Sequence, residues 1–180
     1  MDLTRRDLVG RSTAGLVLAQ LADTLAWSTP AAAAAATAPF RNLSPTEAAW
    51  LAGLGEAIAP PSRAAGLAYY IDHHVGVPAA ESLLALRYLD VPPPYLDFYR
   101  AGLKALAGLA PAPPPTGDAR WTAILARLAD GGGPGWQGPP AQALLFAVRL
   151  DAIDVAYGTR AGLARLGVEY LPHIEPEADW

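Results

Sequence analysis

The sequence has no cysteine among its 180 residues. Without cysteine the chain forms no disulfide, ligates no iron–sulfur cluster and attaches no c-type haem, which needs a Cys-x-x-Cys-His motif. Its stability must therefore come from packing or from a partner protein.

Charged residues are also scarce, at 17% of the chain against about 25% in a typical soluble domain. The formal net charge is −4, and basic residues form no cluster, which argues against nucleic acid as a partner. A small domain with so few charges has little to keep its whole surface in water. We therefore expect another protein to cover part of that surface, with an alanine-rich coding bias as the alternative explanation.

The sequence also lacks the common motifs of nucleotide binding and hydrolysis. It contains no Gly-x-Gly-x-x-Gly after a strand, no Gly-x-x-x-x-Gly-Lys-Ser/Thr and no Gly-x-Ser-x-Gly. The glycine-rich stretch from Gly131 to Gly135 includes Pro134 and no lysine, so it does not match a phosphate-binding loop. We expect a chain that binds no cofactor and is not catalytic by itself.

Residues 1–36 have the three parts of a bacterial export signal: a basic start, a short apolar run and a tract of small residues at Ala31–Ala36. The pair Arg5 and Arg6, followed by Leu8, indicates the twin-arginine route, which exports proteins already folded. We interpret this leader as a targeting segment rather than part of the fold, and we expect cleavage within the alanine tract and a periplasmic protein.

The competing interpretations of the leader are an ordinary amphipathic helix at the start of a cytoplasmic protein and a permanent membrane anchor. The apolar run begins after Arg11 and ends before Asp23, so it is shorter than the ~20 residues that span a bilayer. An uncleaved segment lying at the membrane interface remains the alternative. The leader is formally neutral, so the net charge belongs to the rest of the chain.

The remaining residues predict one domain of about 144 residues. After a linker at 37–43, apolar residues recur at three- and four-residue spacing until residue 158, and no segment shows a convincing strand alternation. The spacing predicts helices at 45–59, about 63–75, from 78 to before 92, 95–109, from 118 through 128, and 141–157. The expected fold is all-α, a compact single-domain bundle with irregular Pro/Gly-rich loops.

The first of these helices has a strong start signal. Ser44 and Glu47 are spaced for a capping box, and Pro45 stands at the first helical position, where its missing N–H costs nothing. Residues 159–180 differ, because Gly162, Gly167 and two prolines disfavour long regular structure. We expect an extended C-terminal arm there that needs a surface to lie on.

The densest polar cluster is Asp72-His73-His74. Adjacent helical residues point about 100° apart, so His73 and His74 do not chelate one metal in the way of a His-x-x-x-His pair. A third histidine, His173, joins them only if the arm folds back. On the longest helix Asp151 and Asp154 favour a solvated or ion-paired face, beside Arg149 or Arg165, over a carboxylate dyad.

Taken together, the twin-arginine leader, the helical body, the segment Ala68–Asp72 (Ala-Tyr-Tyr-Ile-Asp) and the late segment Leu171–Ile174 (Leu-Pro-His-Ile) resemble the gluconate 2-dehydrogenase subunit 3 family. These are small subunits of bacterial flavin-dependent sugar and polyol dehydrogenases that act on gluconate, fructose, sorbitol or glucose. The likeness covers most of the chain, and the leader and the Tyr-Ile-Asp segment are its specific parts. The chain departs from the family at residues 168–173, where a Gly-Tyr-Pro-Gly motif is expected.

The resemblance implies a non-catalytic partner in a membrane-associated periplasmic complex. In such complexes a large FAD-containing subunit of the glucose–methanol–choline type performs the oxidation, and a multihaem cytochrome c subunit passes electrons to quinone. The small subunit supplies the export signal and supports folding of the large one, and contacts the membrane only through the complex. The residues we expect at the partner interface are Tyr69, Tyr70, Asp72, Tyr170, Leu171, His173, Ile174 and Trp180.

A different class of function stays open. The chain would then be a stand-alone periplasmic metal-binding protein or enzyme that uses His73, His74 and His173. A third alternative is a periplasmic binding module without a redox partner.

Overall fold

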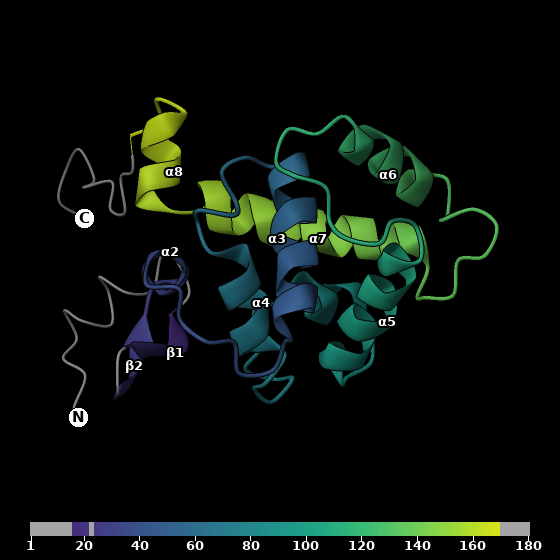
Figure 1. Cartoon of the computed structure of the whole chain (residues 1–180). Coiled ribbons are helices and arrows are strands. Elements are labelled where there is room, and N and C mark those ends of the chain that lie inside the picture. Colours follow the sequence, from purple (N-terminus) through teal and green to yellow (C-terminus); the bar gives the residue numbers. More distant parts are fainter. Residues whose placement is uncertain (1–15, 22–23, 170–180) are drawn as a thin grey trace, which may run out of the picture.

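The computed structural model describes residues 16–21 and 24–169, and about 52% of the chain is helical. Figure 1 shows a helical body with a small sheet at one side. In chain order the elements are β1 (Val17–Leu21), β2 (Thr24–Ser28), α2 (Pro30–Ala35), α3 (Pro45–Ile58), α4 (Leu67–His74), the 3-10 helix η1 (Ala85–Leu89), α5 (Tyr95–Ala107), α6 (Arg120–Ala129), α7 (Ala141–Tyr157) and α8 (Arg160–Arg165).

The prediction of an all-α fold is wrong, because β1 and β2 pair as an antiparallel sheet inside the predicted leader. The register places Val17 opposite Ser28 and Leu21 opposite Thr24. Inward and outward positions do alternate in β1, with Val17 and Ala19 buried and Gln20 exposed. Leu18, an apolar residue at an intervening position, made this alternation look like one continuous apolar run.

The helical body is organised around α7. This helix contacts α3, α4, α5, α6, α8 and η1, and Figure 1 shows it crossing behind α3. Its inner face presents Leu144, Val148 and Val155, all buried. The pairing of α7 with each neighbouring helix thus builds one continuous core.

The start of α3 is as predicted. The Ser44 Oγ atom accepts from the Glu47 N–H, and the Glu47 carboxylate accepts from the Ser44 N–H, so both halves of the capping box are present. Farther along α3, a Cβ added at Gly55 would collide with the side chain of Leu67. The absence of a side chain at Gly55 therefore lets α3 and α4 approach closely.

Two predicted helices differ from the structure. The one expected from 63 begins at Leu67, because Gly66 has a φ of +88° and turns the chain there. The one expected from 78 is reduced to η1, since the Leu83 N–H and the Ala85 N–H bind side chains of other helices instead of continuing a helical ladder. Of the predicted C-terminal arm, the described part contains the short helix α8.

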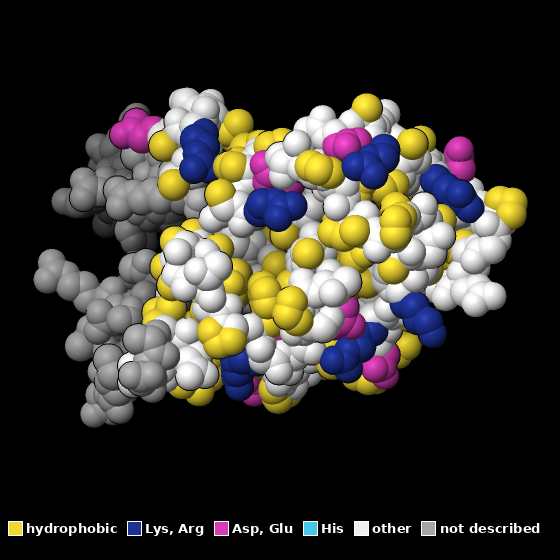
Figure 2. All heavy atoms as spheres, viewed as in Figure 1, with side chains coloured by type: hydrophobic (Ala, Val, Ile, Leu, Met, Phe, Trp, Pro, Cys, Tyr) yellow, Lys and Arg dark blue, Asp and Glu magenta, His cyan; other side chains and the backbone are white. Residues whose placement is uncertain are grey.

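The described helices are all too short or too polar to cross a membrane. Figure 2 shows apolar side chains spread over the visible face, with charged side chains placed among them. The low charge content of the sequence thus appears on this face as scattered charged side chains between apolar and other groups.

Candidate functional site

Helix α4 is the point at which several segments of the chain meet. It contacts β1, α2, α3 and α7, and it includes Ala68 to Asp72, one of the segments from which the sequence led us to expect the family resemblance. Each polar side chain from Tyr69 to His74 hydrogen-bonds to a segment outside α4. The segment therefore forms a polar junction between α4 and the segments around it.

The Asp72 carboxylate is bound by three successive backbone amides. Its Oδ1 atom accepts from the N–H groups of Asn42 and Leu43, each at 2.8 Å, and its Oδ2 atom accepts from that of Arg41 at 3.0 Å. The Asn42 side chain donates in return to the Asp72 carbonyl at 2.6 Å. Consecutive amides of this kind compensate a buried anion. Asp72, which is 4% exposed, therefore fixes the loop at 41–43 against α4.

The His73 side chain joins α4 to the hairpin. Its Nδ1 atom accepts from the Leu18 N–H at 3.2 Å, and the Trp27 ring meets it edge-on at 5.3 Å between centroids. Burial lowers the pKa of His73, the charge of Arg41 lowers it further, and Asp72 acts in the opposite direction. The imidazole is thus held neutral, with Nδ1 as an acceptor.

His74 makes the equivalent contact on the other side of α4. Its Nδ1 atom accepts from the Leu83 N–H at 3.3 Å, and its ring packs on Tyr70 at 4.6 Å. Burial, followed by the effect of His73, lowers the pKa of His74 to about 4. The Nε2 atom of His74 is buried and meets no hydrogen-bond partner among the described residues.

The two imidazoles lie 4.9 Å apart between centroids, yet they are poorly arranged for a metal. Both Nδ1 atoms accept from backbone N–H groups, so the hydrogen of each neutral ring is on Nε2. Neither ring then offers a free lone pair without breaking one of these bonds. Within residues 16–21 and 24–169, no three His, Cys, Asp or Glu side chains gather as a metal site.

The two tyrosines of the segment also bind within the chain. The Tyr69 hydroxyl donates to the Ala38 carbonyl at 2.8 Å, and its ring stacks on Phe40. The Tyr70 hydroxyl donates to the Leu83 carbonyl at 2.9 Å, and burial raises the pKa of Tyr70. Tyr69 is half-buried, whereas Tyr70 and Asp72 are buried, so of the three only Tyr69 lies near the surface. Their contact with a partner stays a prediction.

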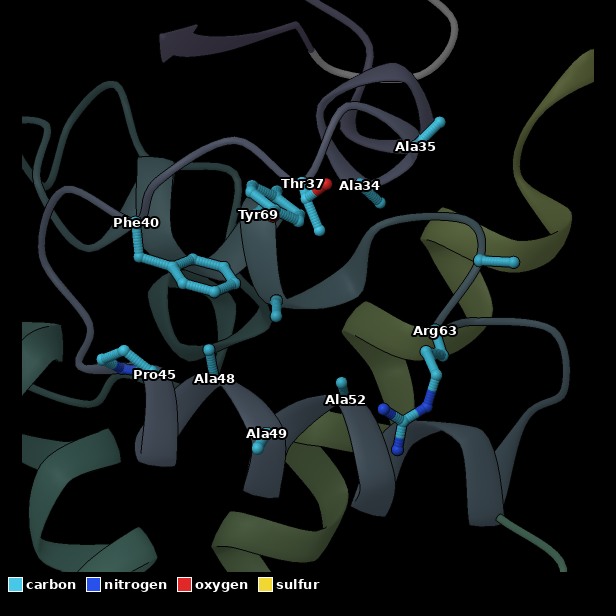
Figure 3. Close-up of a pocket in the computed structure, with 12 residues that line it drawn as sticks. Ala34, Ala35, Thr37, Phe40, Pro45, Ala48, Ala49, Ala52, Arg63 and Tyr69 are labelled. Carbon is cyan, nitrogen blue, oxygen red and sulfur yellow. The ribbon is translucent and has the colours of Figure 1, made fainter. Parts of the chain in front are cut away.

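A cavity of about 550 Å³ separates the α2 segment from α3. Figure 3 shows Phe40 and Tyr69 at one end of it, Arg63 at the other, and Ala48, Ala49 and Ala52 of α3 between them. The lining is mostly methyl groups, and the Tyr69 hydroxyl is already bound to Ala38. The cavity thus has few polar groups to orient a substrate.

Asp151 is a buried carboxyl group, although the sequence predicted an exposed position for it. We expected it on a solvated or ion-paired face, but it is 2% exposed and accepts from the Ala85 N–H and from the Tyr99 hydroxyl. No ion pair joins it, or the exposed Asp154, to an arginine among the described residues. Asp151 follows Val148 by three residues and precedes Val155 by four. This helical spacing places Asp151 on the same buried face as the two valines, and it could have predicted the burial of Asp151.

The outer face of α7 exposes large apolar side chains. Phe146, Leu150 and Ile153 are 46%, 38% and 39% exposed, and their spacing places them in one row, which we call the α7 stripe. Beside it, a groove of about 670 Å³ runs between α6 and α7 and includes Arg149 on its rim. The sequence does not reveal this stripe, because α7 is apolar on both faces and periodicity alone does not separate them.

The other predicted functional residues lie outside the described part of the chain. They are Arg5, Arg6 and Leu8 of the export signal, and Tyr170, Leu171, His173, Ile174 and Trp180 of the C-terminal arm.

Comparisons with protein-family models, curated proteins and solved structures find no match to this chain.

Proposed function

We propose that this chain is the non-catalytic small subunit of a periplasmic FAD-dependent sugar or polyol dehydrogenase. It supplies the twin-arginine signal for a large flavoprotein subunit and stabilises that subunit. The observation that carries the proposal is the leader, with Arg5 and Arg6 ahead of a short apolar run and an alanine tract. The Tyr-Ile-Asp segment supports it through the family resemblance.

Two structural features are consistent with a subunit that binds another protein. The α7 stripe places three large apolar side chains in one exposed row beside a groove, and such rows are typical of interaction surfaces. The polar groups of α4 hold the subunit together, because each binds a backbone group of another segment. We propose that FAD and haem c belong to the large and cytochrome subunits, and that this chain reaches the inner membrane through them.

Coexpression with the large flavoprotein tests the export role. In the double variant Arg5→Lys with Arg6→Lys, we expect the flavoprotein to remain in the cytoplasm, because the transporter recognises the arginine pair. The matched control is Arg63→Lys with Arg165→Lys, which makes the same chemical change at two exposed sites of the body. Normal export of the flavoprotein with the leader variant would show that the escort role is wrong.

The alternative, a metal protein using His73, His74 and His173, has weaker support in the geometry. Binding through Nε2 would require His73 and His74 to give up their bonds from Leu18 and Leu83. Metal analysis of the purified protein separates the two proposals. Stoichiometric metal that is lost on His73→Ala would favour the alternative.

A further inference from the structure

Part of the predicted leader packs on the body as a separate layer. This layer, which we call the leader cover, consists of residues 16–21 and 24–36 of the predicted leader together with residues 37 and 38 of the linker. Four of its buried apolar side chains, Val17, Ala19, Ala33 and Ala38, form their own cluster with Leu21 and Tyr69. None of them belongs to the main core built by α3 to α7. The apolar cluster of the cover is thus separate from the main core.

The cover fits α4 closely but is loosely packed elsewhere. Cavities of about 550 Å³ and 220 Å³ flank α2, the first against α3 and the second against α7 and α8. Among the helices of the body, α4 is the one that contacts both β1 and α2, so the cover rests mainly on α4. Against α4, by contrast, a Cβ at Gly66 would collide with the Pro30 carbonyl.

The contacts on α4 are made largely to the backbone of the cover. His73 Nδ1 accepts the Leu18 N–H, and the Tyr69 hydroxyl donates to the Ala38 carbonyl. His73 and Tyr69 are four residues apart on α4, and they bind backbone groups of the cover whatever its side chains, one in β1 and one after α2. The buried side chains of β1, Val17 and Ala19, are small or medium in size and apolar.

We propose that the leader cover occupies, within the same chain, the α4 face on which an extended segment of the large flavoprotein subunit binds. The incoming segment replaces Leu18 and Ala38 as the partner of His73 and Tyr69, and it supplies small apolar side chains in place of Val17 and Ala19. This inference rests on the proposed function. In the full chain the cover therefore blocks the α4 face on which the partner binds, until the cover leaves α4.

The position of the cover can be measured without any partner. The natural chain has no cysteine, so Ala33→Cys provides a single thiol at a fully buried position of the cover. The rate of its reaction with a maleimide reports how often the cover leaves α4. We expect slow labelling of the folded full-length chain and fast labelling in denaturant.

Leu18→Pro releases the cover by removing the N–H that His73 accepts. N–H direction alternates along a strand, so the Gln20 N–H points the same way as that of Leu18 but binds no residue of α4 in the described part. Gln20→Pro is therefore the matched control. With Ala33→Cys present in both, we expect Leu18→Pro to make the introduced thiol react about tenfold faster than Gln20→Pro does, with the helical circular dichroism of the two variants equal. Val17→Asp, which puts a carboxylate into the cover's cluster, is a second releasing variant.

Capture of the large flavoprotein subunit by the same full-length variants completes the test. Tighter capture by Leu18→Pro and Val17→Asp than by Gln20→Pro supports the inference. Equal capture by all three overturns it while the escort role stands, whereas capture by none overturns both. Fast labelling of the thiol in a chain that carries only Ala33→Cys also overturns it, whatever the flavoprotein does.

Discussion

The Tyr99 hydroxyl donates a 2.7 Å hydrogen bond to the Oδ2 atom of Asp151, and both side chains are buried between α5 and α7. The Ala85 N–H donates to the other carboxyl oxygen, so a single acid joins α5, α7 and η1. Burial raises the pKa of Asp151 to about 7, although both hydrogen bonds act to lower it, and burial also raises the pKa of Tyr99. Asp151 therefore loses its proton only near neutral pH, in a buried position.

Asp151→Asn should stabilise the protein more as the pH rises. The folded pKa lies above the ordinary value of 3.8, so the contribution of Asp151 to stability is complete below pH 4 and is lost as the pH rises through 7. The loss in the natural chain is on the order of 4 kcal/mol. Asparagine does not ionise, and it still accepts from Ala85. Urea unfolding of both proteins at pH 4.5 and pH 8 measures the difference, and an equal difference at the two values would contradict this expectation.

His74 predicts the opposite dependence on pH. Its folded pKa of about 4 is below the ordinary 6.5, so its contribution is complete above pH 6.5 and falls as the pH drops toward 4. The expected loss is on the order of 3 kcal/mol. Ionisation of Asp151 changes the stability in the opposite direction over the same pH range. The stability of the His74 variant should therefore be measured in a protein that also carries Asp151→Asn. His74→Gln, which keeps an acceptor for Leu83, should make the profile less steep there, and the lowered pKa of His73 leaves a weaker dependence of the same sign. An unchanged slope would assign the dependence to another group.

Asp72→Asn should destabilise the fold through the loop at 41–43. The amide would replace one of two acceptor oxygens by a donor facing a backbone N–H, and an unsatisfied buried donor costs about 1–3 kcal/mol. Asp97→Asn is the control, since Asp97 is exposed on α5. Chemical denaturation of the two variants tests this, and similar midpoints would show that the three amides do not depend on the carboxylate.

The α7 stripe yields a prediction about assembly. Leu150→Lys should leave the free energy of unfolding within about 0.5 kcal/mol, because the side chain is already exposed. If the stripe contacts the large subunit, the same change should weaken the complex at least about tenfold. The control, Leu166→Lys, alters an apolar side chain that follows α8 and is 57% exposed. Titration of the flavoprotein with both variants would show equal affinities if the stripe is not an interface.

The sequence predicted those helices whose signals are local. Ser44 and Glu47 determine where α3 begins, and Pro140 and Gly158 bracket α7, so both helices lie where the pattern placed them. The helix predicted after Pro78 was wrong because of tertiary contacts. Backbone amides of this segment bind His74 and Asp151, which belong to other helices. No local pattern reports such a contact.

The hairpin was missed for a different reason. Ala22-Asp23, the dipeptide between β1 and β2, is not one of the usual hairpin signals, and a short apolar run after paired arginines fits an export signal equally well. For the candidate site, the sequence singled out Asp72, His73 and His74 as a polar cluster. It did not predict that each would bind a backbone amide of another segment, because which segments lie next to α4 depends on the whole fold.

Helix α2 lies within the alanine tract where we expect cleavage, and Ala33 at its centre is fully buried. A protease acts on chain that has opened locally, so the bonds of this tract are protected while the helix stays docked. The rate of maturation would then be set by how often α2 unfolds rather than by the peptidase. We therefore predict that removal of the leader is a late event, which the folded subunit delays until the cover has been displaced.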